Sequence, residues 1–235
     1  MRHEDETFDT TKYVLKQYSA VRSGRMIAWA QYWHTPGMFH PLKFMMNIVG
    51  ITPPVADFSS TKFQQYIQRT VSSGVTITTL AEEASRDPES YRKFYELWME
   101  IARDQPLPDT FTPVSYENFM KEMINGPNIL PNACLIARVN DRYVGLSSSG
   151  KTENEPSNLY QWLTGTLREY RGRGIAMTLK LGVIEFAKRN GYEIIKTWND
   201  STNVGMLAIN QKLGYRRHVG WITYEKRLDP ETVPK

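Results

Sequence analysis

The segment 159–176 constrains this chain most, because an apolar strand-like run passes there through an arginine- and glycine-rich turn into an amphipathic helix. The turn reads Arg171-Gly-Arg-Gly-Ile-Ala176. N–H groups in the first turn of a helix have no intrahelical acceptor and lie at the positive end of its dipole. Glycines there lack the Cβ atoms that would keep a phosphate away. The segment predicts an anion site, to which three arginines add charge: Arg168, Arg171 and Arg173.

Three interpretations of this turn compete. A Walker loop needs Gly-Lys-Ser or Gly-Lys-Thr at the start of the helix, and the chain has neither there. A dinucleotide fingerprint needs a third glycine, where Met177 stands, and an acid at the end of the next strand, whereas Glu193 begins that strand. The third interpretation is a plain tight turn. The residues alone leave a phosphate site and a plain turn both open.

Composition bounds the class of protein. Of 235 residues, 40% are hydrophobic and 23% charged, a balance typical of soluble globular chains with one large or two small domains. The net charge of +4 suits an anionic ligand but lacks the broad basic surface of a nucleic-acid binder. We therefore expect no nucleic-acid partner.

A single cysteine, Cys134, excludes an intrachain disulfide and a two-cysteine metal site, and no metal is predicted. The first residues, Met-Arg-His-Glu-Asp-Glu-Thr, do not read as a signal or transit peptide. No run approaches the roughly 18 to 20 apolar residues of a membrane-spanning helix. These observations favour a cytoplasmic protein without a membrane partner.

From residue 75 onward, the pattern predicts a strand, two helices, three strands, a helix, a strand, a helix and a strand. The helix after the turn carries an apolar face of Ile175, Leu179, Val183 and Phe186, and the basic residues Lys180, Lys188 and Arg189 are expected elsewhere on it. The predicted strands are 75–80, 133–139, 143–148, 159–167, 192–198 and 221–228, and the predicted helices are 87–102, 115–124, 175–189 and 203–213.

The N-terminal part is predicted to hold three strands, 12–21, 25–33 and 44–51, followed by a helix over 60–71. Three strands without a covering helix need the rest of the chain, or a second copy, to pack against. We divide the chain into a β-rich extension with its linking helix, 1–70, and a second domain, 71–235.

The turn and its surroundings resemble one family. Arg171-Gly-Arg-Gly174-Ile-Ala176 matches the Arg/Gln-x-x-Gly-x-Gly/Ala motif of the GNAT (Gcn5-related) N-acetyltransferases, and a helix at Asn203 and a Lys-Leu-Gly-Tyr215 ending follow in family order. The resemblance covers roughly 75–228. It implies the mixed α/β (α+β) GNAT fold, with a mostly antiparallel central sheet flanked by helices. It further implies acetyl-CoA as donor substrate and a small-molecule primary amine as acceptor.

Carried over by position, the resemblance places the CoA pyrophosphate on N–H groups from Gly172 through Arg173, Gly174 and Ile175 to Ala176, beside Arg171. The backbone of Thr164, Gly165 and Thr166 would pair with the pantetheine arm like an added strand. The N–H of Thr164 would hold the thioester oxygen and stabilise the oxyanion as the amine attacks. Asn203 would contact the pantetheine arm, or be an ordinary helix N-cap.

The sequence departs from the family pattern at Asn210, where many members carry a tyrosine that protonates the departing thiolate. An asparagine cannot act as an acid, although its amide could hydrogen-bond the sulfur. The thiolate then leaves as an anion, is protonated by water or Tyr215, or leaves slowly. A catalytically weak acyl-CoA-binding regulatory module is therefore the alternative function.

No spacing identifies the general base. Glu117, Asp104 and His218 are candidates, and each also suits a solvated surface. Acids between Glu82 and Asp104 either attract a cationic amine or form the charged face of a helix. Cys134 has no histidine near it in sequence, which favours direct transfer over a covalent enzyme intermediate.

Gly74-Val-Thr-Ile-Thr-Thr-Leu80 with Asp87-Pro88 is similar to the segment before the second domain of tandem GNAT proteins. By that resemblance, residues 1–55 are the remnant of a shortened first domain. They lack the arginine–glycine turn, so we expect no CoA there and a structural or homodimer-forming role.

Overall fold

The computed structural model describes residues 14–22, 25–34, 42–51, 54–106 and 111–225, and side chains within 54–106 and 111–216. Its strands form one nine-stranded sheet in the order β1-β2-β9-β3-β8-β7-β6-β5-β4. Neighbouring strands are antiparallel except β2–β9 and β7–β8, which are parallel. The strands are β1 Val14–Arg22, β2 Arg25–His34, β3 Leu42–Ile51, β4 Thr76–Thr79, β5 Leu135–Val139, β6 Arg142–Gly150, β7 Asn158–Thr166, β8 Ile194–Asp200 and β9 Tyr215–Glu225.

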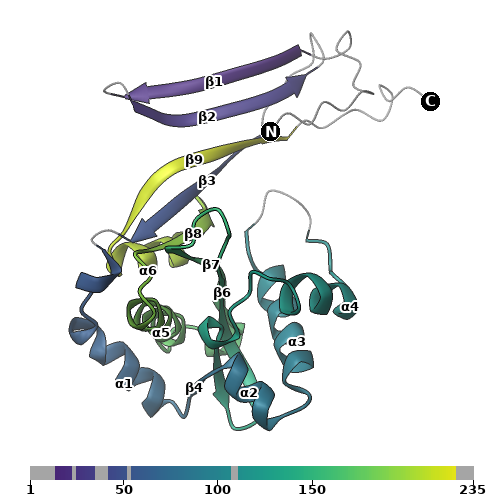
Figure 1. Cartoon of the computed structure of the whole chain (residues 1–235), viewed down its shortest axis with the longest axis vertical. Helices are drawn as coiled ribbons and strands as arrows, with labels where there is room; N and C mark the ends of the chain where they lie inside the picture. The colour runs from purple at the N-terminus through teal and green to yellow at the C-terminus, as the bar shows by residue number, and fades with distance from the viewer. Residues whose placement is uncertain (1–13, 23–24, 35–41, 52–53, 107–110, 226–235) are drawn as a thin grey trace.

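Helices cover both faces of the sheet's second half (Figure 1). One group is α1 Gln64–Ser72, α5 Ile175–Arg189 and α6 Val204–Lys212, and the other is α2 Leu80–Arg86, α3 Ser90–Arg103 and α4 Tyr116–Phe119, which continues as a π-helical turn, Met120–Ile124. A Cβ on Gly145 would lie 3.2 Å from Ile175 of α5, whereas one on Gly165 would collide with Ile101 of α3. Since Gly145 pairs with Thr166 and not with Gly165, α5 and α3 lie on opposite faces.

The core follows the apolar periodicity of the sequence. Ile175, Leu179 and Val183 are buried on α5. β6 and β7 are buried along nearly their whole length, because the sheet is covered on both faces there. Phe94 of α3 and Phe119 of α4 pack with ring centroids 6.3 Å apart. The predicted mixed sheet flanked by helices is confirmed.

The structure corrects the predicted order at one helix and several boundaries. α2 precedes the helix expected from residue 87, so three helices rather than two separate β4 from β5. Its start was readable from Thr79-Leu-Ala-Glu82, because Thr79 Oγ1 accepts from the Glu82 N–H at 3.1 Å and Glu82 Oε2 from the Thr79 N–H at 2.9 Å. The last strand begins at Tyr215, not Trp221, and its predicted end at 228 lies outside the described residues.

The three N-terminal strands expected from the sequence are present. β1 and β2 form an antiparallel hairpin, and β2 joins β9 through the single pair Ala28 and Gly220. β3 pairs along one edge with β8 and along the other with β9. Figure 1 shows β3 and β9 rising together from the helical part toward the hairpin. β3 is therefore an interior strand of the common sheet.

Candidate functional site

A cleft opens where β7 and β8 stop pairing. Their parallel register covers only Asn158–Ile194, Leu159–Ile195 and Tyr160–Lys196, although both strands continue beyond it. A cavity of about 470 Å³ follows, lined by both diverging strands and by the starts of α5 and α6. A volume in this range suits a small molecule or part of a larger cofactor. The unpaired edge of β7 is thereby available to a ligand.

The arginine–glycine turn lies at one end of this cavity. Gly172 and Gly174 have φ of +77° and +86°, and Gly174 is the N-cap residue of α5. A Cβ on Gly172 would meet nothing within 4 Å, whereas one on Gly174 would lie 3.1 Å from the Tyr66 carbonyl oxygen and 3.2 Å from Thr70 Oγ1. Gly172 keeps the approach to the helix N-terminus open, and Gly174 allows close packing against α1.

Helix α1 forms part of the site, which the sequence did not indicate. Tyr66 and Arg69 line the cavity. Thr70 Oγ1 lies 2.9 Å from Thr178 Oγ1 of α5 and 3.3 Å from the Arg173 carbonyl oxygen, to which it donates. The sequence analysis assigned α1 to the N-terminal part of the chain. In the structure, α1 packs against the turn and α5.

The cavity brings together nine of the residues expected to contact CoA. Arg173 is absent from the lining; its guanidinium donates to the Glu169 carbonyl oxygen at 3.1 Å and lies over the Tyr170 ring. Asn203 is a helix N-cap, since its Oδ1 accepts from the Met206 N–H of α6 at 3.2 Å, and it also lines the cavity. The nine are Thr164, Gly165, Thr166, Arg171, Gly172, Gly174, Ile175, Ala176 and Asn203.

The charged residues of the cavity lining are mainly basic. Arg69, Arg171, Lys180 and Lys212 contribute to the lining, against one acid, Asp104. Such a surplus favours an anionic ligand.

Asp104 is held by two arginines of the turn. Its carboxylate accepts from Arg168 at 2.6 and 2.8 Å and from Arg171 at 2.6 Å. The hydrogen bond from Arg168, followed by that from Arg171, lowers the pKa of Asp104 to about 2 against the opposing effect of burial. A carboxyl group with so low a pKa is a weak general base. Asp104 instead ties the end of α3 to the turn before α5.

Lys180 departs most from expectation. Assigned to a face of α5 other than the apolar one, it is buried with 1% of its surface exposed and lines the cavity. Its ammonium donates to Gln161 Oε1 and lies 4.9 Å from the centroid of the Tyr215 ring. Burial lowers the pKa of Lys180 to about 7. No local sequence pattern indicates this burial, because Gln161 and Tyr215 reach Lys180 only through the tertiary fold.

Neither Asn210, whose amide could hydrogen-bond the sulfur, nor Tyr215, the side chain that could protonate the thiolate, lines the cavity. Asn210 is 1% exposed, not a surface residue, and its Nδ2 donates to Asn199 Oδ1 at 2.5 Å. Tyr215 is buried, donates to Gln161 Oε1 at 3.3 Å, and has a pKa raised by burial. Each nevertheless contacts a residue that lines the cavity, Asn210 through Asn199 and Tyr215 through Lys180.

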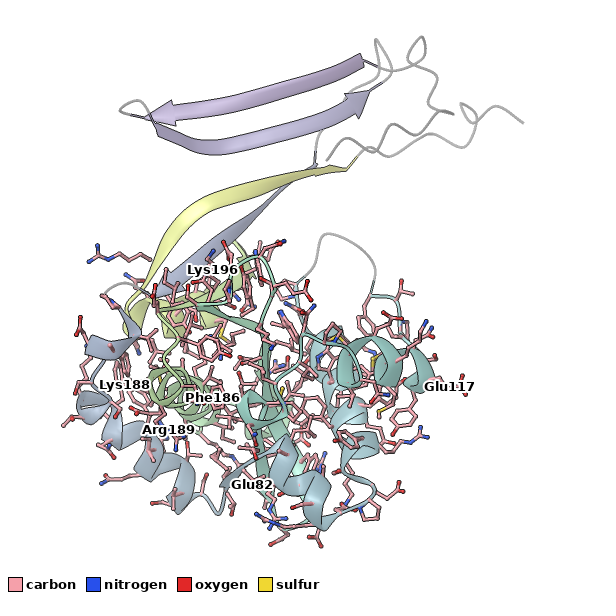
Figure 2. All side chains as sticks on the ribbon, in the orientation of Figure 1. Glu82, Glu117, Phe186, Lys188, Arg189 and Lys196 are labelled. Atoms are coloured by element: carbon pink, nitrogen blue, oxygen red, sulfur yellow. The ribbon has the colours of Figure 1, made fainter. Side chains whose placement is uncertain are left out.

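The other candidate residues are not gathered at the cavity. Glu117 is exposed on α4, at the periphery of the molecule in Figure 2. The side chain of His218 lies outside the described ones. Cys134 is fully buried, and burial raises the pKa of its thiol to about 12, so it is not an available nucleophile.

Within residues 54–106 and 111–216, no cluster of three or more His, Cys, Asp or Glu side chains is placed to hold a metal ion. None of the helices in the described part of the chain has the length and apolar character needed to cross a membrane.

The splayed parallel strands, the glycine turn and the helix N-terminus form one cleft, and comparison with known proteins identifies the family to which the chain belongs. The model of the acetyltransferase (GNAT) family matches residues 91–215, more than half of the chain. The chain belongs to this family.

Particular relatives are more distant. An uncharacterized N-acetyltransferase of Methanocaldococcus jannaschii is 33% identical over 63 residues, which are 26% of this chain and 28% of that protein. A GCN5-related N-acetyltransferase from Sphaerobacter thermophilus has a similar fold, with a TM-score of 0.54, 19% identity and coverage of 83% of this chain and 56% of that one. A glucosamine N-acetyltransferase region of a fungal multi-domain β-N-acetylglucosaminidase aligns with a TM-score of 0.56 and 12% identity over 78% of this chain and 21% of that one. The chain thus spans well under two thirds of the length of these relatives, and the structural likenesses bear on the fold alone.

Proposed function

We propose that this protein transfers an acetyl group from acetyl-CoA directly to a primary amine of a small molecule. The observation that carries the proposal is the continuous cavity from the β7–β8 cleft to the open N-terminus of α5. Membership of the acetyltransferase family supports it.

In this proposal the pyrophosphate lies on the N–H groups between Gly172 and Ala176. The turn suits this anion because Gly172 leaves the approach open and Arg171 and Arg69 supply charge. The pantetheine arm then lies along the free edge of β7 from Thr166 to Thr164. Acetyl-CoA is the donor substrate, and its thioester ends at the cleft.

The chemical step is direct attack. The amine nitrogen bonds to the thioester carbon, the Thr164 N–H stabilises the oxyanion, and the carbon–sulfur bond breaks with its electron pair remaining on sulfur. The nitrogen loses one proton to solvent. The buried thiol of Cys134 argues against an acyl-cysteine intermediate.

The acceptor would enter beside α3, where Ile101, Pro106, Trp162 and Trp198 line the cavity. These walls enclose an amine better than they would a nucleic-acid strand, which needs an extended basic surface. We place the protein in the cytoplasm, since its one cysteine is a free thiol.

A thermal shift with acetyl-CoA tests the donor site. At about 100 times the dissociation constant, the ligand should add roughly 2.7 kcal/mol, or on the order of 5 to 10 °C for a chain of this size. Gly172→Glu should abolish the shift, because its side chain and charge would fill the cradle.

Gly191→Glu is the matched control. Gly191 has φ of +74° and equally open surroundings, but lies after α5 and outside the cavity. Both variants should lose about the same stability from a side chain at positive φ, and only Gly172→Glu should lose the ligand response. Gly174 is unsuitable as a probe, since a substitution there would strike α1.

Turnover of acetyl-CoA with a panel of primary amines then tests the transfer. Release of CoA with one class of amine supports an enzyme. Tight binding with no release for any amine would instead indicate the binding module.

A further inference from the structure

A chain of buried hydrogen bonds joins Lys180 to the proposed thioester position. Lys180 donates to Gln161 Oε1, Gln161 Nε2 donates to Ser147 Oγ at 2.8 Å, and Ser147 Oγ lies 2.8 Å from Thr164 Oγ1. Lys180, Gln161 and Ser147 are all 1% exposed or less. Thr164 is half-buried and lines the cavity. The chain therefore runs from the interior to the surface of the cleft.

The amide orientation of Gln161 follows from its partners. Lys180 keeps N–H groups to donate in either protonation state, and its contact with Gln161 is to the amide oxygen. The Tyr215 hydroxyl donates to the same oxygen at 3.3 Å, which favours the same orientation. The amide nitrogen is thereby directed at Ser147.

The number of hydroxyl protons determines which residue donates in the hydrogen bond between Ser147 and Thr164. Its hydroxyl has one proton and accepts from Gln161, and its remaining described partner is Thr164. If Thr164 donated to Ser147, the serine proton would be buried without an acceptor, which is unfavourable. Ser147 therefore donates to Thr164, and the Thr164 proton is left for the cavity.

The hydroxyls of Ser147 and Thr164 lie on the face of the sheet that is covered by α5, the helix that follows the arginine–glycine turn. Ser147 and Thr164 are direct partners in the β6–β7 register, and Gly145, two residues before Ser147, lies under Ile175 of α5. Asn210 packs behind Asn199 and offers no hydroxyl to the cavity. No described residue of the cleft accepts the proton of the Thr164 hydroxyl, so this hydroxyl can donate to a ligand in the cavity.

We propose that the Thr164 hydroxyl is a catalytic hydrogen-bond donor to the sulfur of the departing CoA, and that Lys180 is a positioning residue that orients it through Gln161 and Ser147. The inference rests on the proposed function. The hydrogen bond stabilises the thiolate as the carbon–sulfur bond breaks, with no proton transferred. The thiolate leaves as the anion and is protonated in water.

The test measures the pKa of the thiol of CoA bound to the whole protein, from the ultraviolet absorbance of its thiolate during a pH titration. It needs no acceptor. A hydrogen bond to the charged sulfur should lower this pKa in the wild type by about one to two pH units relative to Thr164→Val. Thr164→Ser, which restores a hydroxyl, should return it to the wild-type value.

Lys180→Met should raise the thiol pKa about as much as Thr164→Val, and the double variant no further, because the lysine acts through the threonine. Methionine fills the site without a buried charge, so the variant should fold. Ser147→Ala is a second route to the same effect.

Two controls share these environments without entering the chain. Ser149→Ala removes a fully buried β6 hydroxyl that has no described partner, and Lys188→Met removes an α5 lysine that donates to the Phe58 carbonyl oxygen at 3.0 Å. Both should leave the thiol pKa unchanged.

The outcomes separate the two proposals. A wild type that does not bind CoA contradicts the proposed function. A wild type that binds CoA, with the same thiol pKa in Thr164→Val, overturns this inference alone. A change in Thr164→Val without one in Lys180→Met and Ser147→Ala overturns the positioning role.

Discussion

At the scale of single residues, an ion-pair cluster of two arginines and one aspartate lies beside the cavity. Arg168 and Arg171 emerge from the same turn and converge on Asp104 from α3. The sequence predicted that these arginines add charge to an anion site, but no local pattern indicated that an acid would meet them. The pairing brings the end of α3 to the mouth of the cavity.

This ion pair has a pH signature. The pKa of Asp104 is about 2 in the folded protein and near 3.9 unfolded, so its stabilisation is complete above about pH 4 and is lost as pH falls toward 2. Because the arginine side chains are 77% and 51% exposed, we expect Asp104→Asn to lower the free energy of unfolding by only about 1 kcal/mol at pH 7.

Denaturant unfolding at pH 7 and pH 3 measures this difference, which should shrink at the lower pH. Asp141→Asn, in an exposed turn, controls for removal of a negative charge. An Asp104→Asn deficit of the same size at both pH values would contradict the interpretation.

At the scale of elements, the donor turn depends on a helix that precedes the family-matched segment. α1 contacts α5 through Thr70, whose side chain is fully buried and bonded to both Thr178 and the Arg173 carbonyl. The turn is therefore held from inside by β7 and from outside by α1.

Thr70→Val should weaken this contact. It removes a buried hydroxyl with two partners while keeping the side-chain volume, and we expect a loss of about 1 to 2 kcal/mol in the free energy of unfolding. The acetyl-CoA thermal shift should also fall, because the Arg173 carbonyl and the turn lose a support. Thr61→Val, at an exposed threonine bonded to Ser59, is the control and should change neither.

At the scale of the whole molecule, the N-terminal strands divide into two parts. β3 is bonded on both edges, whereas the β1–β2 hairpin meets the rest of the sheet at one residue pair. Residues 1–55 were proposed to be the remnant of a first domain and to form a homodimer. Because β3 belongs to the common sheet, these two proposals now apply mainly to the β1–β2 hairpin.

Two truncations separate these parts. A chain that begins near residue 40 keeps β3 and should remain soluble with its acetyl-CoA response. One that begins near Ser59 would leave open edges on β8 and β9, and we expect it to aggregate. Sedimentation of both truncated chains measures their oligomeric state. If the full chain is a dimer and the chain that begins near residue 40 is a monomer, the hairpin forms the dimer. Full solubility and CoA binding in the shorter chain would show that β3 is dispensable.

The sequence by itself determined the fold class, most strands and helices, and the arginine–glycine turn at the start of α5. These depend on periodicity, capping and turn chemistry, which act over a few neighbouring residues. Even α2, which is absent from the predicted order, has a local signal in the capping box of Thr79 and Glu82.

Only the tertiary structure decided which distant residues complete the site. Thr70 and Thr178 are separated by 108 positions, and Arg168 and Asp104 by 64. Lys180 has the same local sequence whether it faces water or Gln161, so its burial depends on which strands lie beneath α5. Contacts of this kind arise from packing of the whole sheet, and no local pattern encodes them.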